Sequence, residues 1–425
     1  MKRFVRAVTL PAMVVGAIGL LFSADALADQ KITGAVPKSP HQVSSGTCQE
    51  CHEEIYAQWQ NSMHANSTAL HDPIHGGFYR KVVGDPTRED VKTKKGAYPV
   101  CLKCHSPAAA LDKKTKLDAM PAYEQGVNCI SCHTIESFKG VKAADGKAQY
   151  GTDAYQMSST ALQAPSGRSY TIQPIDESVA PTPATKPFHP FPMEGNSIHK
   201  TNVVCMGCHD RRDNFKGAPL CVTGDEYNQV SSFVACQSCH MPKVKHMTKD
   251  GKIIELADHS MAGGHSEAMV SEAMVMSMKA EKSGDNIKAT VSLHNRIPHA
   301  FPTGAPFRNF YLKVTAYDEA GKPLWQNFEK HPMEEDPKSM FVKVLGDETG
   351  KPAAPPQATQ VLKDTRLQPN ERREVEYDIP AAGVKLVRAE ALYNLLLPPF
   401  VKMLGDALTP DLKAPKAAGM AEVSL

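Results

Sequence analysis

The pattern Cys-X-X-Cys-His occurs five times between residues 48 and 240, and it constrains this chain more than any other feature. Two cysteines at this spacing lie about one helical turn apart, so both thiols can bond to the vinyl groups of one porphyrin. The histidine that follows can then bind the iron, which makes the pattern typical of covalent c-type haem attachment. We number the copies in chain order: Cys48-Cys51-His52 (motif 1), Cys101-Cys104-His105 (motif 2), Cys129-Cys132-His133 (motif 3), Cys205-Cys208-His209 (motif 4) and Cys236-Cys239-His240 (motif 5).

Zinc binding is the alternative role of such cysteine pairs, because two pairs can complete a tetrahedral site. A histidine after every pair favours haem instead. The eleventh cysteine, Cys221, is interpreted as a buried small hydrophobic residue and is given no role. The sequence therefore predicts five covalently bound haem c groups, whose proximal iron ligands are His52, His105, His133, His209 and His240.

Residues 1–28 have the pattern of a secretory signal peptide. Cations at positions 2, 3 and 6 precede an apolar run at 13–22, and Ala26-Leu27-Ala28 precedes the expected cleavage site before Asp29. No later apolar stretch reaches the roughly 18 to 20 residues that span a bilayer. We therefore expect an exported protein without a transmembrane segment after cleavage, located in the periplasm, at the cell surface or outside the cell.

The charge balance argues against nucleic acid as a partner. The formal net charge is +2, and loss of the predicted signal removes three cations and Asp25, which leaves a formally neutral chain. Haem propionates then add negative charge, whereas nucleic-acid binding requires a basic patch. The expected partners are other redox proteins that donate or accept electrons.

The chain divides into two regions that differ in their expected secondary structure. The motifs crowd five macrocycles into about 190 residues, so the haems must supply much of the core of this region. Short helices are expected at 53–61 and 120–129, the segment 175–192 is proline-rich and irregular, and little sheet is expected before about residue 270. We therefore predict a mainly α and irregular pentahaem cytochrome c domain at 29–270.

Alternating apolar residues dominate the rest of the chain and predict strands at 273–280, 287–294, 310–317, 323–328, 361–367, 371–379 and 384–395. Seven short strands favour an all-β, immunoglobulin-like sandwich domain at 271–410. The last residues, 411–425, are predicted to be a flexible tail. The β-domain has no haem motif, and packing or docking is its expected role.

The second axial ligand of each iron decides whether a haem carries electrons or offers an open site to a substrate. His64 follows motif 1 together with Trp59, Ser62 and Ala65, and this string resembles the family that includes the tetrahaem cytochrome of bacterial hydroxylamine oxidation. The resemblance implies that His64 is a distal ligand. The segment after motif 5 also resembles these cytochromes and adds two candidate ligands, His259 and His265.

Two further distal ligands are predicted outside these strings. His199 lies six residues before motif 4, where its side chain can reach a neighbouring haem. His299 begins the segment His-Ala-Phe-Pro-Thr-Gly, which resembles a signature of β-domains appended to multihaem cytochromes and implies that the β-domain clamps the haem region. Arg308 follows as a candidate partner of a haem propionate or as an ordinary strand-edge arginine. The remaining histidines of the motif region are interpreted as solvated surface residues: His71, His75, His189 and His246.

These observations predict an electron-transfer protein of low-potential respiration, with no catalytic residue, whose haems have histidine on both faces. One alternative is an enzyme with one open haem that acts on a small nitrogen or sulfur compound. Pentahaem nitrite reductases use Cys-X-X-Cys-Lys at the active haem, whereas every motif here ends in histidine. Another alternative is a homo-oligomer or an extracellular cytochrome filament, in which one chain supplies a ligand to the next.

Overall fold

The computed structural model describes residues 37–167, 169, 189–230 and 233–425. Pro37–Leu425 form one compact unit. The predicted signal peptide and nearly all of the proline-rich segment at 175–192 lie outside the described residues. Within the described ranges, no helix is both long enough and apolar enough to cross a bilayer.

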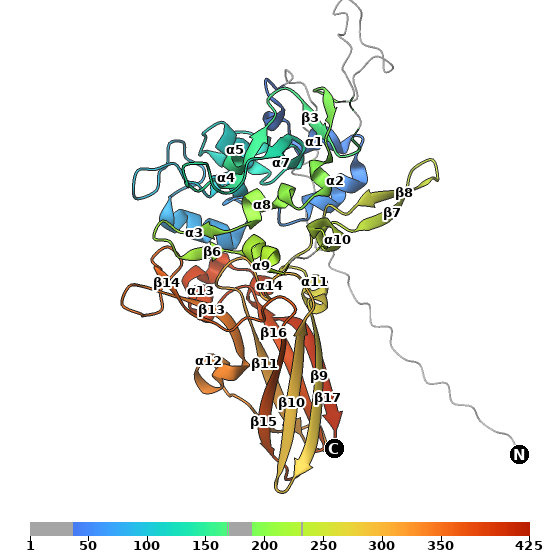
Figure 1. Ribbon diagram of the computed structural model, residues 1–425, viewed down its shortest axis with the longest axis vertical. Coiled ribbons are helices and arrows are strands. Elements are labelled where there is room, and N and C mark those ends of the chain that lie inside the picture. The colour runs from blue at the N-terminus through green and yellow to red at the C-terminus, as the bar shows by residue number, and fades with distance from the viewer. Residues whose placement is uncertain (1–36, 168, 170–188, 231–232) are drawn as a thin grey trace, which may run out of the picture. The chain divides into compact units, whose positions relative to one another are not determined.

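The motif region is built from short helices joined by loops (Figure 1). Proline at the first turn begins α3, α5 and α6, because its fixed φ suits a helix start and its missing N–H is not needed there. Helices of this length are unstable alone, so tertiary contacts must hold them. Their bounds are α1 Ser45–Gln49, α2 Glu53–Gln60, α3 Pro73–Val82, α4 Leu102–His105, α5 Pro107–Leu111, α6 Pro121–Glu124, α7 Cys129–His133, α8 Val203–His209, α9 Thr223–Gln229, α10 Cys236–His240 and α11 Glu267–Glu272.

Sheet in the described part of this region is limited to two-stranded ladders. One pair is parallel and the other pairs are antiparallel. The ladders are β1 (Ile135–Phe138) with β2 (Tyr155–Met157), β3 (Leu162–Ala164) with β4 (Met193–Gly195), β5 (Arg212–Asp213) with β6 (Pro219–Cys221), and β7 (Lys243–Met247) with β8 (Ile253–Ala257). The scarcity of sheet before residue 270 agrees with the sequence analysis.

The C-terminal region is β-rich and contains two antiparallel sheets (Figure 1). The three-stranded sheet has the order β15 (Arg372–Pro380), β10 (Asn286–Asn295), β9 (Met274–Ser283). The six-stranded sheet has the order β14 (Gln360–Asp364), β13 (Met340–Gly346), β11 (Asn309–Tyr317), β16 (Leu386–Asn394), β17 (Lys416–Ser424), with β12 (Pro323–Gln326) paired to β11. Short helices accompany them at α12 (Pro332–Glu335), α13 (Pro398–Leu404) and α14 (Pro410–Lys413).

The two sheets share one hydrophobic core. Alternate residues of β10 point inward, so Ile287 and Val291 are fully buried while their neighbours face outward. Phe310 of β11 and Phe341 of β13 stack with ring centroids 4.1 Å apart. This alternation is why the sequence pattern located β9, β10, β11, β15 and β16.

Two strands of the C-terminal region, β13 and β17, were not predicted. β13 is buried on both faces along nearly its whole length, so its residues do not alternate between apolar and polar. The predicted flexible tail at 411–425 is wrong, because this segment contains α14 and β17, and β17 pairs with β16 from Lys416 to Ser424. Small residues in the tail weaken its strand signal, whereas the exposed edge of β16 supplies the hydrogen-bond partners that order it.

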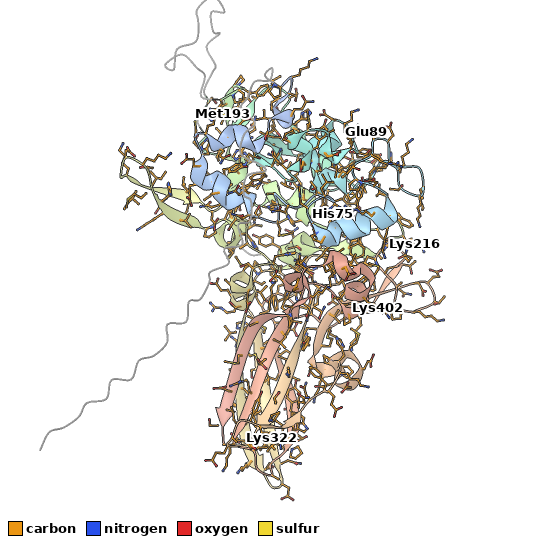
Figure 2. All side chains as sticks on the ribbon, turned by 180° about the vertical axis from the view of Figure 1, so that it is seen from behind. His75, Glu89, Met193, Lys216, Lys322 and Lys402 are labelled. Carbon is orange, nitrogen blue, oxygen red and sulfur yellow. The ribbon has the colours of Figure 1, made fainter. Side chains whose placement is uncertain are left out.

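Helix α3 packs directly on the β-rich region. Ile74 of α3 belongs to the core of the two sheets. Phe78, one turn later, lies 5.4 Å from Phe307 and 5.8 Å from Phe400, measured between ring centroids. This apolar contact orients the helix that carries His75, which is labelled in Figure 2.

Candidate haem centres

Each motif folds around a short helical turn that brings its cysteines and histidine to one side. In motif 1 the amide of His52 donates to the carbonyl of Cys48 at 2.9 Å, and in motif 2 the amide of His105 donates to the carbonyl of Cys101 at 3.0 Å. Motifs 3, 4 and 5 lie on α7, α8 and α10. The local geometry that covalent haem attachment requires is therefore formed by the chain itself.

Each motif histidine faces a second histidine from elsewhere in the chain. The centroid separations of the imidazole rings are 6.3 Å for His52 and His189, 3.9 Å for His105 and His75, 5.0 Å for His133 and His199, 6.0 Å for His209 and His64, and 6.4 Å for His240 and His299. The five motifs thus have five different partners.

These separations can be compared with the geometry of an iron held between two imidazoles. A metal–nitrogen bond is about 2 Å long, and the ring centre lies about 1 Å beyond the nitrogen, so opposite rings are about 6 Å apart. The pairs of motifs 1, 4 and 5 have this separation. The pairs of motifs 2 and 3 are closer and must separate to admit iron.

Hydrogen bonding leaves the ring nitrogen that would bind iron free. The Nε2 atoms of His75 and His199 are buried and have no hydrogen-bond partner among the described residues. The Nδ1 atom of His75 lies 2.9 Å from the carbonyl of Ser67, and the Nδ1 atom of His299 lies 3.0 Å from the carbonyl of Ala300. Such a carbonyl fixes the ring and its tautomer, so that Nε2 points to the metal. The residues fit haem iron.

Burial keeps several of these imidazoles neutral. Burial, followed by the influence of neighbouring histidine rings, lowers the pKa of His64, His199 and His209 to about 4. The pKa of His299 is also lowered, chiefly by burial. Because only a neutral imidazole can ligate a metal, these side chains are in the binding form at neutral pH.

The structure sorts the predicted distal ligands into two groups. His64, His199 and His299 each face a motif histidine. His259 and His265 form no ring pair with a motif histidine within the described residues; they stay predictions. The Nδ1 atom of His259 lies 2.8 Å from the carbonyl of Ala257.

Two partners were missed. The surface interpretation of His75 is wrong, because its Nε2 atom is buried. The signal was buried Tyr79, which lies one helical turn after His75 on α3, with the two ring centroids 5.9 Å apart. His189 is half-buried beside His52. It lies in an irregular segment, so no periodicity in the sequence could have indicated it.

The other surface histidines and Cys221 have simpler surroundings. His71 lies 3.2 Å from Glu124, and His246 lies 3.6 Å from Glu54, with their side chains 40% and 33% exposed. The Sγ atom of half-buried Cys221 lies 3.8 Å from the carbonyl of His209. None of the three faces a motif histidine in the part of the chain that the structure describes.

Contacts between thiols show which motifs are neighbours. Motif 1 lies beside motif 3, motif 2 beside motif 4, and motif 4 beside motif 5, through the pairs Cys48 and Cys129, Cys104 and Cys208, and Cys205 and Cys236. Cys132 of motif 3 lies close enough to Cys208 of motif 4 to raise its pKa, after the larger effects of Cys104 and of burial. The hydroxyl of Tyr155, on β2, also accepts from the amide of Gly207 in motif 4 at 2.8 Å. Motif 4 is therefore next to motifs 2, 3 and 5. Because electron tunnelling slows steeply with distance, such proximity favours transfer from haem to haem.

A loop after motif 5 joins the ligands of two motifs. The Sδ atom of Met261 lies 2.7 Å from Nδ1 of His64, and the carbonyl of Ala262 lies 2.7 Å from Nδ1 of His240. Met261 has φ +46°, a conformation that is uncommon for residues other than glycine. The loop thus orients the distal side of motif 4 and the proximal side of motif 5 together.

A buried ion pair connects α9 to the β-rich region. Glu226 and Arg366 are 4% and 5% exposed, and Nη1 of Arg366 lies 2.8 Å from Oε1 of Glu226. Asp364 binds the other side of the guanidinium through two hydrogen bonds of 2.8 Å. A charge buried this deeply is tolerated only with such partners.

Glu226 also holds the loop that carries His299. Its Oε2 atom accepts from the amide of Ala300 at 3.1 Å and from the hydroxyl of Thr303 at 2.6 Å. The side-chain amide of Asn295 donates to the carbonyl of His299 at 2.9 Å. His299 is therefore fixed opposite motif 5 from both regions.

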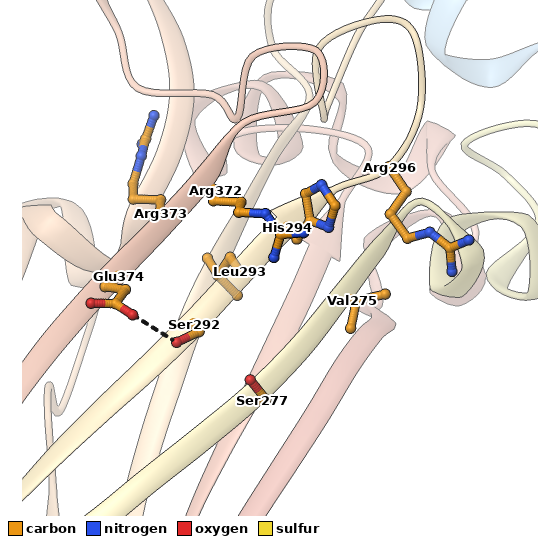
Figure 3. A pocket seen from close by; sticks show the side chains of 9 residues that line it. All are labelled: Val275, Ser277, Ser292, Leu293, His294, Arg296, Arg372, Arg373 and Glu374. Atoms are coloured by element: carbon orange, nitrogen blue, oxygen red, sulfur yellow. Dashed lines mark hydrogen bonds between the residues drawn. The ribbon is translucent and has the colours of Figure 1, made fainter.

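A shallow hollow lies on the outer face of β9, β10 and β15 (Figure 3). Its lining includes His294, Arg296 and Arg372, and Ser292 donates to Glu374 at 3.3 Å. None of the predicted haem ligands lines it. The described residues contain no group of three or more histidine, cysteine, aspartate or glutamate side chains arranged around one metal ion.

Comparison with known proteins identifies the class. The family model of cytochrome c554 and c-prime matches residues 47–134, which contain motifs 1 to 3. A crystal structure of a penta-haem cytochrome c552 from Thermochromatium tepidum is 47% identical; the match covers 91% of this chain and 100% of that chain, with a TM-score of 0.81. This chain is a multihaem c-type cytochrome. No curated protein matches it.

As a multihaem c-type cytochrome, the chain binds haem c covalently and transfers electrons through haem iron. The motif cysteines would supply the thioether sulfurs, and the histidine pairs would supply the nitrogens that bind the iron. When bound, haem contributes an iron that changes between the ferric and ferrous states. The protein residues would determine the distances between the irons, their electrostatic surroundings and their ligands.

The ring planes distinguish the motif 4 haem from the others and predict its magnetic signature. His64 and His209 are inclined by 70°, whereas the planes of the other pairs differ by 20° to 31°. Perpendicular imidazoles leave two iron d orbitals close in energy, which gives a strongly anisotropic low-spin signal. We expect one such signal among rhombic signals in the electron paramagnetic resonance spectrum of the ferric protein.

The control for this assignment is His64→Ala. It should remove the anisotropic signal and leave the rhombic signals unchanged. His71→Ala, which removes an exposed histidine, should change neither. A spectrum with rhombic signals alone would contradict the pairing of His64 with His209.

Proposed function

We propose that this protein is an exported pentahaem electron carrier of low-potential respiration, which accepts electrons from one redox protein and passes them to another. The observation that supports it best is the set of five histidine pairs, one for each motif. Two imidazoles leave no axial position for a substrate and favour a lower potential than histidine with methionine. The similar T. tepidum protein is a penta-haem cytochrome, which supports the same haem count.

We also propose the location of the protein, its relatedness to a known cytochrome and the role of its β-rich region as the sequence predicts them. The chain is exported to the periplasm or the cell surface, and it is related to the tetrahaem cytochrome of bacterial hydroxylamine oxidation. The β-rich region has an immunoglobulin-like topology and clamps the haem region through His299. The shared core of the two sheets and the contacts of α3 and α9 with that region support the clamp.

The haem count can be tested by intact mass spectrometry of protein matured by a c-type biogenesis system. We expect the mass of the chain plus five haems, because each motif offers two thiols at the required spacing. Replacing both cysteines of motif 3 by serine should remove one haem, whereas Cys221→Ser should remove none. Four haems on fully matured protein would contradict the proposal.

The role of carrier is tested on the same preparation. The reduced protein should not bind carbon monoxide, and the oxidised protein should not bind cyanide, because both axial positions are filled. Turnover of nitrite, hydroxylamine or sulfite with an artificial electron donor would contradict the role of carrier and would favour an enzyme with an open haem. Sedimentation velocity on the same protein distinguishes a single chain from an oligomer or filament.

A further inference from the structure

Two side chains of the β-rich region, Arg308 and Tyr393, converge on the loop after motif 5 that contacts His64 and His240. A Cβ atom on Gly264 would lie 2.4 Å from the hydroxyl of Tyr393 and 2.9 Å from Nη1 of Arg308. A Cβ atom on Gly304 would lie 3.7 Å from the same Nη1. The guanidinium is therefore packed against two glycine backbones, where a larger residue at position 264 has no room.

This pair lies beside the ligands of motif 4. Arg308 lies close enough to His209 to lower its pKa, after the larger effects of burial and of His240. The loop against which it packs contacts His64 through Met261. Arg308 also hydrogen-bonds Tyr393, which is 2% exposed. A cation and a phenol from the β-rich region thus meet beside the loop that contacts His64, and the cation lies near His209.

Asp72 balances the positive charge of Arg308 from a distance, because the two groups interact electrostatically without an ion pair among the described residues. Within the described residues, Arg308 forms no ion pair with a carboxylate, although it is only partly exposed. Its acidic neighbour Asp72 accepts from the amide of Ile74 at 2.8 Å and caps α3 instead. Burial, followed by the charges of Arg308 and Lys416, lowers the pKa of His265 to about 4, and Lys416 pairs with Asp411 at 3.5 Å. A half-buried guanidinium that no carboxylate contacts has N–H groups available for a further anion.

We propose that Arg308 and Tyr393 bind a propionate carboxylate of the haem attached at motif 4. The planar guanidinium can donate two parallel hydrogen bonds to a carboxylate, and the phenol can donate a third. The inference adds a second role for the β-rich region, independent of His299: it neutralises charge at the haem that lies beside three other motifs.

The expected consequence is a higher reduction potential for this haem. When one electron from a neighbouring ferrous haem converts its ferric iron to ferrous, the positive charge at the iron falls by one. Arg308 offsets the propionate charge and so favours the reduced state. The haem next to motifs 2, 3 and 5 would then hold electrons longer than it would without the guanidinium.

The test is a redox titration of the full-length holoprotein. The haem of motif 4 is followed through its anisotropic electron paramagnetic resonance signal, which His64→Ala should remove. Arg308→Gln should shift the midpoint potential of that haem to a more negative value and leave the others unchanged. Arg308→Lys should restore part of the shift, and Tyr393→Phe should produce a smaller one. Arg388→Gln is the matched control, because Arg388 lies on β16 and pairs with Glu422 at the surface.

A second measurement reports the carboxylate itself. Resonance Raman bands from propionate bending depend on hydrogen bonding, and one of them should shift in Arg308→Gln and in Tyr393→Phe but not in the control. Unchanged potential and unchanged propionate bands in folded Arg308→Gln and Tyr393→Phe proteins would overturn the proposal. A potential that depends on added nitrite or acetate in the native protein but not in Arg308→Gln would show that a free anion occupies the site, and would also overturn it.

Discussion

His299→Ala is expected to convert one low-spin haem, that of motif 5, to a high-spin form that binds carbon monoxide. His299 faces His240 at 6.4 Å, and its removal leaves one axial position of the iron without a protein nitrogen. Absorption spectra of the reduced protein should show stoichiometric carbon monoxide binding at one haem, where the native protein shows none. Added imidazole should restore the low-spin spectrum, because it replaces the missing ring.

The matched control is His294→Ala, on the outer face of the same region. It removes a histidine that faces no motif and should leave the spectrum unchanged. His259→Ala and His265→Ala complete the series. If one of these variants opened a haem while His299→Ala did not, the motif 5 ligand would be assigned to the wrong histidine.

Glu226→Ala is expected to destabilise the protein by about 3 kcal/mol, the lower end of the range for breaking a buried ion pair. The variant leaves Arg366 buried with Asp364 as its remaining carboxylate, and it removes the acceptor that holds Ala300 and Thr303. The loop around His299 should loosen, so carbon monoxide should also gain partial access to the motif 5 haem. Urea unfolding followed by far-ultraviolet circular dichroism measures the first effect.

Glu422→Ala is the control for this variant, because Glu422 forms an exposed ion pair with Arg388 on the same region. Exposed pairs contribute less than about 1 kcal/mol, so the midpoint of unfolding should hardly change. Equal destabilisation by both variants would contradict the assigned role of Glu226. Glu226→Gln keeps the shape of the side chain and separates the loss of charge from the loss of packing.

The strands that could be predicted share one property: the residue pattern that indicates each strand lies within that strand. The strands β9, β10, β15 and β16 each have one face that is more buried than the other, so their residues alternate along the chain. β13 lacks this alternation because both its faces are covered. β17 contains small residues, and its order comes from pairing with β16 rather than from its own composition.

The distal ligands could likewise be predicted only where the neighbouring residues in the sequence indicate them. His64 and His299 could be proposed because their surrounding residues resemble known multihaem cytochromes. His75 and His189 have no such context, and their position opposite His105 and His52 arises only when α3 and the segment around residue 189 pack in the folded chain.

The sequence by itself determined the cofactor and its attachment, because two thiols and an imidazole must lie within one helical turn to bind the same porphyrin. Only the tertiary structure decided which histidine faces which motif, which motifs are neighbours, and how Arg308 and Glu226 approach the haem region. An axial ligand needs a position in space opposite the iron, and residues far apart in the chain can meet that requirement without any fixed spacing.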